Sequence, residues 1–264
     1  MIYLDYNATT PLCAPALEAM QPILERTYGN PSSVHAAGRQ ARAEIDDARD
    51  RLADLLGAKP HELIFTSGGT ESNNLAVIGL ARAHRDRGRH LICASTEHHA
   101  VLHAFEHLGK REEFEVTLLP VDERGRIDPE ELGRAIRNDT ILVSIMAANN
   151  ETGVLQPMEE LASICESRAV LLHSDLVQSF GKVETRLSES GLAAGSFAAH
   201  KFHGPKGAGL LYLRAGLPIE AVQFGGSHEN QRRPGTENVP AIAGMAAAAE
   251  WILRDRAQEQ ARQG

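Results

Sequence analysis

The feature of this sequence that most limits its fold is the alternation of short apolar runs with longer amphipathic stretches. The apolar runs are rich in Ile, Val and Leu, and between them the apolar residues recur at helical spacing. Continuous apolar runs are typical of strands that are covered on both faces, as in a parallel sheet. The alternation therefore predicts an α/β fold with a mostly parallel central sheet flanked by helices.

The same alternation places the individual elements. Strands are expected at Glu62–Thr66, Leu91–Ala94, Phe114–Pro120, Ile141–Met146, Ala169–His173, Ser196–Ala199 and Gly209–Leu213. Helices are expected at Ala41–Leu56, Leu75–Ala83, Pro129–Arg137, Met158–Arg168 and Val239–Arg262. The third of these helices has a typical beginning, because Asp128 is a favourable N-cap and Pro129 suits the first helical position.

Composition excludes several classes of protein. The 264 residues are 42% hydrophobic and 23% charged, which supplies a sizeable core and argues against disorder. The net charge of −8 comes without a basic stripe, so no nucleic-acid partner is expected. No long apolar window and no signal-peptide pattern are visible, so we expect no membrane partner and a cytoplasmic location.

The cysteines argue against disulfide and zinc chemistry. Cys13, Cys93 and Cys165 are an odd number and form no CxxC pair. We expect Cys93 and Cys165 to be core residues of a strand and a helix. No metal site is predicted.

Polar residues that follow the strands are the first candidates for a ligand site, because ligands of such sheets bind at the carboxyl ends of the strands. After the first strand, Gly69 and Thr70 lie in a Gly-rich turn that opens a helix. Exposed backbone N–H groups and a helix N-terminus form a cradle suited to phosphate. A plain turn with a Ser/Thr cap explains the same residues equally well.

Two later strand ends carry charge. Asp175 and Gln178 follow Ala169–His173, and His200 and Lys201 follow Ser196–Ala199. A buried acid needs a cationic partner, although Asp175 is also a reasonable N-cap. A desolvated lysine becomes a nucleophile toward carbonyls, whereas an exposed Lys201 on a loop has no such role.

The remaining candidates are histidines and amides. His98 follows Leu91–Ala94 and can stack on a flat ring, and Asn150 follows Ile141–Met146 beside Asn149. The two amides can bind a ligand or simply shape a turn. His99, His103 and His107 share one face if they are helical, and a polar helix face explains them better than a metal site.

These signals are weak singly and more specific together. A phosphate cradle, a stacking His, an amide, an Asp with a Gln, and a Lys all fall at successive strand ends. That set meets the needs of pyridoxal phosphate: a phosphate anchor, a partner for the ring nitrogen, a donor to the phenolic oxygen and an amine.

The sequence also resembles the cysteine desulfurase family, in the class-V aminotransferase group of fold-type-I pyridoxal-phosphate enzymes. The stretches that carry the resemblance are Tyr3–Pro11, Gly29–His35, Thr66–Asn74, Thr96–His98, Asn149–Gly153, His200–Gly207 and Arg233–Asn238. They run through nearly the whole chain in the family's order.

The resemblance implies a role for each candidate. Lys201 would form the Schiff base and move protons, Asp175 would keep the ring nitrogen protonated, and Gln178 would donate to the phenolic oxygen. His98 would stack on the ring, and Asn150 would touch cofactor or substrate. The phosphate would be held by Gly69, Thr70 and His200, with Ala198 beside them and Thr236 reaching in from a second subunit. That last role implies a homodimer.

The family takes sulfur from L-cysteine, leaving L-alanine and an enzyme persulfide that passes to an acceptor or iron–sulfur scaffold protein. The resemblance divides the chain into a segment at 1–16 that packs on a small domain, a cofactor domain at 17–252, and the start of the small domain at 253–264. The nucleophilic cysteine and a substrate-binding arginine belong to that small domain, so the sequence predicts a truncated chain with little or no turnover.

Two positions depart from the family. Ala198 stands where a serine usually donates to the phosphate, a loss of roughly 1.5–3 kcal/mol. Leu176 stands where an alanine is expected under the ring, and its bulk costs roughly 1–3 kcal/mol if it cannot repack. The alternatives to a desulfurase are another class-V reaction, such as transamination or selenocysteine lyase chemistry, and a non-catalytic dimerisation module.

Overall fold

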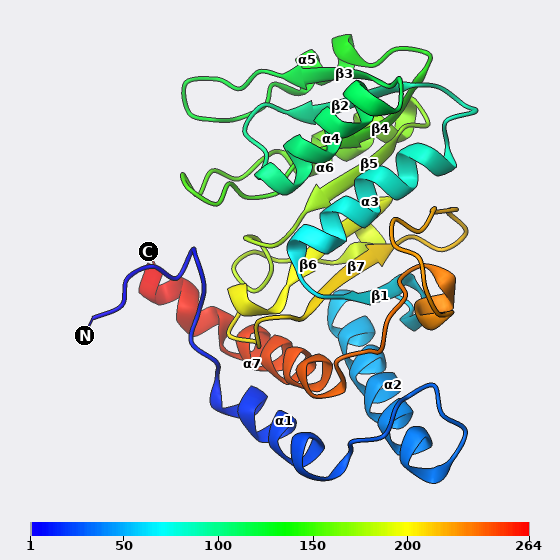
Figure 1. The fold of residues 1–264 in the computed structure, drawn as a ribbon. Coiled ribbons are helices and arrows are strands. Elements are labelled where there is room, and N and C mark those ends of the chain that lie inside the picture. Colours follow the sequence, from blue (N-terminus) through cyan, green and yellow to red (C-terminus); the bar gives the residue numbers. More distant parts are fainter. Residues whose placement is uncertain (1, 264) are drawn as a thin grey trace.

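A computed structural model describes residues 2–263, with the side chains of residues 2–254 and 256. Its centre is a seven-stranded sheet in the order β1-β7-β6-β5-β4-β2-β3 (Figure 1). The strands are β1 (Leu63–Thr66), β2 (His90–Ala94), β3 (Glu115–Leu119), β4 (Thr140–Ser144), β5 (Leu171–Asp175), β6 (Ala194–Ala198) and β7 (Gly209–Leu213). The pairs from β3 through β6 are parallel, which confirms the mostly parallel sheet.

The exception is β7, which lies antiparallel between β1 and β6. A short antiparallel strand has the same apolar character as its parallel neighbours, so its direction was not visible in the sequence. Its insertion separates β1 from β6 and brings the turn after β1 close to the start of β7. A Cβ atom added to Gly209 would lie 2.4 Å from the Gly68 Cα atom, so the glycine allows this approach.

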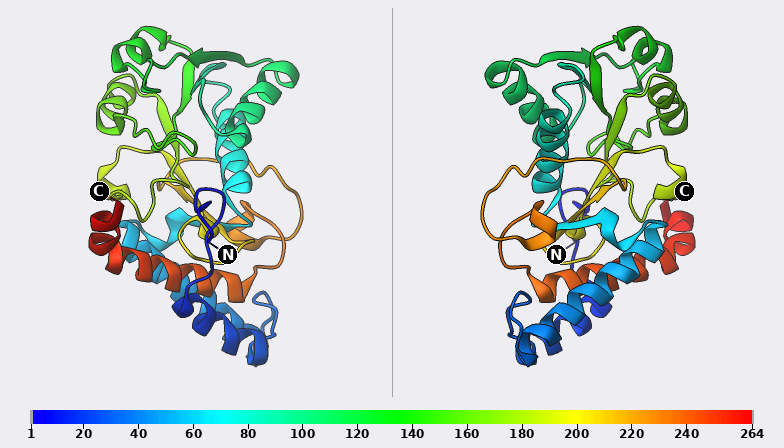
Figure 2. Two further views of the ribbon diagram at one scale, coloured as in Figure 1. Left: turned by 90° about the vertical axis from the view of Figure 1, so that its left-hand side faces the viewer. Right: turned by 90° about the vertical axis from the view of Figure 1, so that its right-hand side faces the viewer.

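Helices cover both faces of the sheet (Figure 2). They are α1 (Ala14–Arg26), α2 (Ala36–Leu56), α3 (Gly69–Ala83), α4 (His99–Arg111), α5 (Pro129–Ala135), α6 (Met158–Ser167) and α7 (Val239–Gln263). Buried residues of α3 and α4 share one hydrophobic cluster, and those of α2, α5, α6 and α7 share the other. The flanked sheet expected from the sequence is therefore confirmed.

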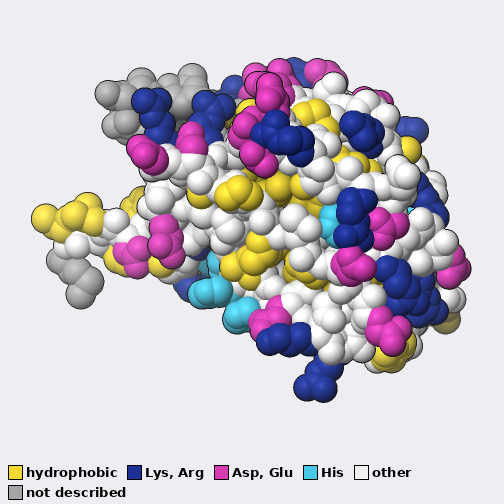
Figure 3. Space-filling model, turned by 90° about the horizontal axis from the view of Figure 1, so that it is seen from above, with side chains coloured by type: hydrophobic (Ala, Val, Ile, Leu, Met, Phe, Trp, Pro, Cys, Tyr) yellow, Lys and Arg dark blue, Asp and Glu magenta, His cyan; other side chains and the backbone are white. Residues whose placement is uncertain are grey.

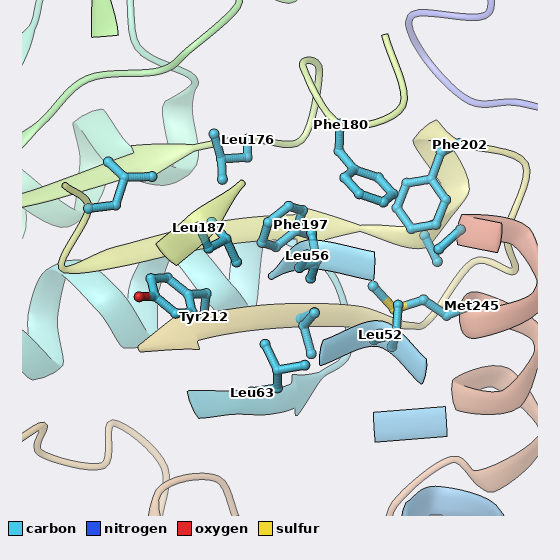
Figure 4. Close-up of a cluster of buried hydrophobic side chains, with 14 of the residues drawn as sticks. Leu52, Leu56, Leu63, Leu176, Phe180, Leu187, Phe197, Phe202, Tyr212 and Met245 are labelled. Carbon is cyan, nitrogen blue, oxygen red and sulfur yellow. The ribbon is translucent and has the colours of Figure 1, made fainter. Parts of the chain in front are cut away.

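The second cluster contains a group of aromatic rings. Phe180 meets Phe197 of β6 edge-on at 5.5 Å between ring centroids and Phe202 at 4.8 Å. Figure 4 shows these rings with Leu176, Leu52 and Leu56 around them. Each large side chain that leaves water here contributes about 1.5–3 kcal/mol to stability.

Two helices were not among the predicted elements, and two others, α2 and α3, begin earlier than predicted. α1 begins at Ala14 and packs on α7, and α4 carries the His99–His107 face. α3 begins at Gly69 rather than Leu75, because its first turns are polar and only its later residues are apolar. Helix periodicity detects a buried face, so a polar beginning escapes it.

Charged side chains are interspersed on the face seen from above in Figure 3. At the end of the sheet next to β3 and α5, Arg137 pairs with Glu115 at 2.6 Å and with Asp139 at 2.8 Å. Arg134 pairs with Glu131 at 2.8 Å. Within residues 2–263, no helix is both long enough and apolar enough to span a membrane.

His173 connects three neighbouring strands of the sheet, β4, β5 and β6, through its two ring nitrogens. Nδ1 of His173 in β5 lies 2.8 Å from Ser144 Oγ of β4, and its Nε2 lies 3.0 Å from Ser196 Oγ of β6. Burial lowers the pKa of His173 to about 3, because a charged imidazole would lose its hydration there. The ring is therefore neutral in the folded chain.

This histidine predicts a sensitivity to acid. Unfolding lets His173 return to its ordinary pKa, so the stability from this site is complete above about pH 6.5 and is lost as pH falls toward 3. When the pH is lowered from 7 to 5, we expect the free energy of unfolding to fall by roughly 2 kcal/mol more in the parent chain than in the His173→Gln chain. Urea titrations at the two pH values measure this, and equal losses would contradict it.

Candidate cofactor cleft

A cavity of about 380 Å³ opens at the carboxyl ends of the central strands. It is within the usual size range of a small-molecule site. Nine residues predicted from the sequence line it together: Gly69, Thr70, His98, Asn150, Asp175, Gln178, Ala198, His200 and Lys201. The structure thus brings together residues from the ends of five strands, β1, β2, β4, β5 and β6.

Asp175 is the last residue of β5 and forms the buried floor of the cleft. Its Oδ2 accepts a hydrogen bond from Asn73 Nδ2 at 2.7 Å, and its Oδ1 accepts one from the Val177 N–H at 2.9 Å. Burial raises the pKa of Asp175, and these two hydrogen bonds oppose that shift. No ion pair to Asp175 is present among the described residues, so this acid suits a cation that enters the cleft.

Asn73 is one of the site residues that sequence reasoning missed. It lies 1% exposed in α3, and its Oδ1 has no hydrogen-bond partner among the described residues. A signal was present in the sequence, because an asparagine next to the apolar face of a buried helix needs a polar reason to be there. Here that reason is the Asp175 carboxylate.

Lys201 ends a single 3₁₀ turn, η3 (Ala199–Lys201), that follows β6. Burial lowers the pKa of its amine, while Asp175 and Asp5 partly oppose the shift. The same turn carries His200, whose pKa is lowered by burial and by the nearby Lys201 charge. A lysine in this setting is neutral more often than one in water, which favours nucleophilic attack on a carbonyl.

The N-terminal strap, residues 5–11, closes one side of the cleft. The Thr10 N–H and Oγ1 both donate to the His200 carbonyl at 2.9 Å, and Thr10 Oγ1 accepts from the His203 N–H at 2.8 Å. Asp5, Asn7 and Ala8 line the cavity. The sequence-based expectation assigned residues 1–16 to packing on a small domain and so missed this part of the site.

The Asn7 carbonyl of the strap contacts two side chains of the cleft. It accepts a hydrogen bond from Lys201 Nζ at 2.5 Å and another from Gln178 Nε2 at 2.9 Å. Gln178 in turn accepts a hydrogen bond from Lys182 Nζ at 2.7 Å through its Oε1. One carbonyl oxygen therefore connects the strap to both the amine and the amide of the cleft.

The opposite end of the cleft is built for an anion. α3 begins there at Gly69, so its first backbone N–H groups and its partial positive charge face the cavity beside Thr70. His98 caps α4, accepting a hydrogen bond from the Ala100 N–H at 3.0 Å through Nδ1. That contact fixes the base of the ring while the ring itself lines the cleft.

The two asparagines after β4 divide the roles that the sequence left open. Asn149 Oδ1 accepts hydrogen bonds from the N–H groups of Glu151 and Thr152, so Asn149 shapes a turn. Asn150 lines the cavity. The turn-shaping role is therefore confirmed for Asn149, and ligand binding by Asn150 stays a prediction.

The expectation that Leu176 lies under the cofactor ring is wrong. Leu176 is 4% exposed and packs in the core beside Gly195, where it belongs to the cluster in Figure 4. Val177 lines the cavity instead. The chain turns directly after Leu176, because the Ser179 and Phe180 N–H groups both donate to the Leu176 carbonyl, and this turn brings Val177 and Gln178 to the cleft.

Other sequence candidates lie elsewhere. Thr236 lines a separate small cavity beside β1, not the cleft of its own chain. Cys93 and Cys165 are buried in β2 and α6, as predicted, and burial raises the pKa of Cys165 to about 12. Among the described residues, no cluster of three or more His, Cys, Asp or Glu side chains is arranged to hold a metal ion.

The groups in the cleft fit pyridoxal phosphate. The buried Asp175 carboxyl suits a protonated ring nitrogen, the α3 N-terminus suits a phosphate, and the Lys201 amine suits an aldehyde. Gln178 offers an amide donor between the amine and the floor. Ala198 lines the cavity without a hydroxyl, so the phosphate there depends on the helix end, Thr70 and His200.

Comparisons with known proteins agree with this geometry. Residues 2–263 match the family model described as Aminotransferase class-V. The cysteine desulfurase IscS of Dictyoglomus turgidum is 49% identical over 98% of this chain, which spans 65% of that relative's length. Solved structures titled "NIFS-like protein" and "SspA in complex with cysteine" superpose with TM-scores of 0.95 and 0.91 at 41% and 37% identity. The first match covers 97% of this chain and 71% of the solved chain, and the second covers 95% of this chain and 72% of the solved chain.

Proposed function

Because this chain belongs to the class-V aminotransferase family, whose members use pyridoxal phosphate, we propose that its cleft is the cofactor site of a cysteine desulfurase. The observation that carries the proposal is that Lys201 and Asp175 line the same cavity. The similarity to named cysteine desulfurases supports L-cysteine as the substrate, with L-alanine and a persulfide as products.

Each residue of the cleft has a task in this reaction. The cofactor, when bound, supplies an aldehyde and an electron-withdrawing ring. Lys201 would hold the aldehyde through its amine, whose neutral form burial favours, and would carry protons to and from the substrate. Asp175 would keep the ring nitrogen protonated, because its buried carboxylate would gain a cationic partner there.

The other residues bind and orient. His98 would stack on the ring, Gln178 would donate through Nε2 to the phenolic oxygen, and Asn150 would bind cofactor or substrate. Gly69, Thr70 and His200 would hold the phosphate at the beginning of α3. Val177 also lines the cavity and would supply an apolar contact to the ring.

The persulfide step needs a thiolate close to the substrate sulfur. Cys13, Cys93 and Cys165 are all buried free thiols, and none of them lines the cleft. Burial raises the pKa of each, which keeps it protonated. None of these three is therefore proposed as the nucleophile, and an acceptor thiol must approach the cleft from elsewhere.

The proposed function is tested with the cofactor and L-cysteine. We expect the chain to bind pyridoxal phosphate with a visible absorbance band, and L-cysteine to change that band. Alanine analysis with dithiothreitol present distinguishes desulfuration from transamination, which would convert L-cysteine to 3-mercaptopyruvate and leave its sulfur in place. A folded chain that gives no band would contradict the proposal and favour the non-catalytic module.

We also propose a homodimer in the cytoplasm that passes sulfur to an acceptor or iron–sulfur scaffold protein. The position of Thr236, away from the cleft of its own chain, leaves it available to a second subunit. Three free cysteines are typical of a reducing compartment. Sedimentation of the cofactor-loaded chain tests the dimer.

A further inference from the structure

The amide of Gln178 is held by two partners of opposite kind. Lys182 Nζ can only donate, so the atom 2.7 Å from it is the amide oxygen. The Asn7 carbonyl can only accept, so the atom 2.9 Å from it is the amide nitrogen. Together these contacts fix the orientation of the amide: Nε2 faces the strap and the cleft, and Oε1 faces Lys182.

Lys182 itself stands outside the cavity. It follows Gly181 in the turn after the Phe180 ring, and its side chain is more than half buried. Its hydrogen bond to Gln178 is charge-assisted, which makes it stronger and shorter than one between neutral groups. A cationic donor behind the amide also polarises it, so the N–H groups on the other side become better donors.

We propose that Lys182 is a positioning residue, which holds the Gln178 amide so that its Nε2 faces the cleft. This inference rests on the proposed function, in which Gln178 donates to the phenolic oxygen of pyridoxal phosphate. Without Lys182, rotation of the amide would place its oxygen toward that anionic oxygen and replace an attraction by a repulsion.

The Asn7 carbonyl limits this rotation from the other side. A flipped amide would turn its oxygen toward the Asn7 carbonyl oxygen, which also accepts from Lys201. The strap therefore favours the same orientation as Lys182 does. Of the two described partners of Gln178, the Asn7 carbonyl also binds the Lys201 amine, whereas Lys182 shares no hydrogen bond with it.

The test is a set of cofactor titrations on the full chain, followed by absorbance. We expect Lys182→Met to weaken pyridoxal phosphate binding about tenfold and to shift the absorbance maximum of the bound cofactor. Lys182→Arg, which keeps a cationic donor, should restore binding to within about threefold. Lys110→Met, an exposed lysine paired with Glu106 in α4, is the matched control and should bind normally.

A double-mutant cycle separates this role from general stability. If Lys182 acts through Gln178, Lys182→Met should add almost nothing to the loss seen in Gln178→Leu. Additive losses, or a Lys182→Met chain whose affinity and absorbance maximum match those of the parent, would overturn the inference. If Lys182→Met does not fold, a Lys182→Arg chain with an unchanged maximum supports the inference, and a parent-like Lys182→Gln chain overturns it. Failure of the proposed function is a different result, because the parent chain itself would then show no band.

Discussion

The Lys201→Ala chain is expected to fold normally and to lose covalent retention of pyridoxal phosphate. Lys201 supplies the only amine among the residues that line the described cleft, and burial lowers its pKa toward the neutral, nucleophilic form. Its side chain is only partly buried, so truncation leaves no large cavity in the core. Any turnover should fall by about a thousandfold or more, because nucleophile and proton carrier are lost together.

Borohydride reduction followed by peptide mass analysis measures this loss directly. The parent chain should carry the reduced cofactor on the peptide that contains Lys201, and the Lys201→Ala chain should carry none there. Lys206→Ala removes an exposed lysine a few residues later and should retain the label. If Lys182 of the Lys201→Ala chain carried as much label as Lys201 carries in the parent chain, the assignment of Lys201 as the nucleophile would be contradicted.

Replacement of Asp175 by asparagine should affect stability and cofactor binding in opposite directions. Without a cation, Asp175 is a buried acid whose pKa is raised by desolvation. Its ionisation therefore opposes folding, with no penalty below the ordinary pKa near 4 and an increasing penalty as pH rises through the raised pKa. We expect Asp175→Asn to stabilise the cofactor-free chain by about 1–3 kcal/mol at neutral pH.

The side-chain amide introduced by Asp175→Asn also fits the surrounding hydrogen bonds. Asn73 donates to Asp175 through Nδ2, and its own Oδ1 has no partner among the described residues. Rotation of the Asn73 amide would present that oxygen to the new Nδ2 group at position 175. Thermal unfolding at pH 5 and at pH 7.5 checks the stability change, which should be larger at the higher pH.

Cofactor binding should respond in the opposite sense. A neutral amide cannot hold a proton on the ring nitrogen, so breaking this buried pair should weaken binding or turnover by about 100-fold to 1000-fold. Added pyridoxal phosphate should then raise the melting temperature of the parent far more than that of Asp175→Asn. Equal rises would show that the carboxylate does not contact the bound cofactor.

Most of the cleft was predictable because strand ends in a parallel sheet converge. Asp175 and Lys201 each follow an apolar run, and neither position depends on a distant part of the chain for its recognition. The order of strands was not predictable in the same way. β7 inserts antiparallel between β1 and β6, a choice made by tertiary packing rather than by its own residues.

The residues that sequence reasoning missed depend on contacts across the chain. Asn73 became visible as a site residue only when β5 placed Asp175 against α3. The Asn7 carbonyl is a backbone group, so no side-chain pattern could mark it. Leu176 was expected at the cleft, but Val177 lines it instead, because the turn that follows β5 decides which side chain faces the cleft.

The strap has a consequence for biosynthesis. Thr10 leaves the ribosome 190 residues ahead of its hydrogen-bond partner His200. The nascent chain must therefore keep the strap available until β6 and η3 have emerged and folded. Capture of the cofactor during translation should be a late event, which marks completion of the sheet rather than guiding its early growth.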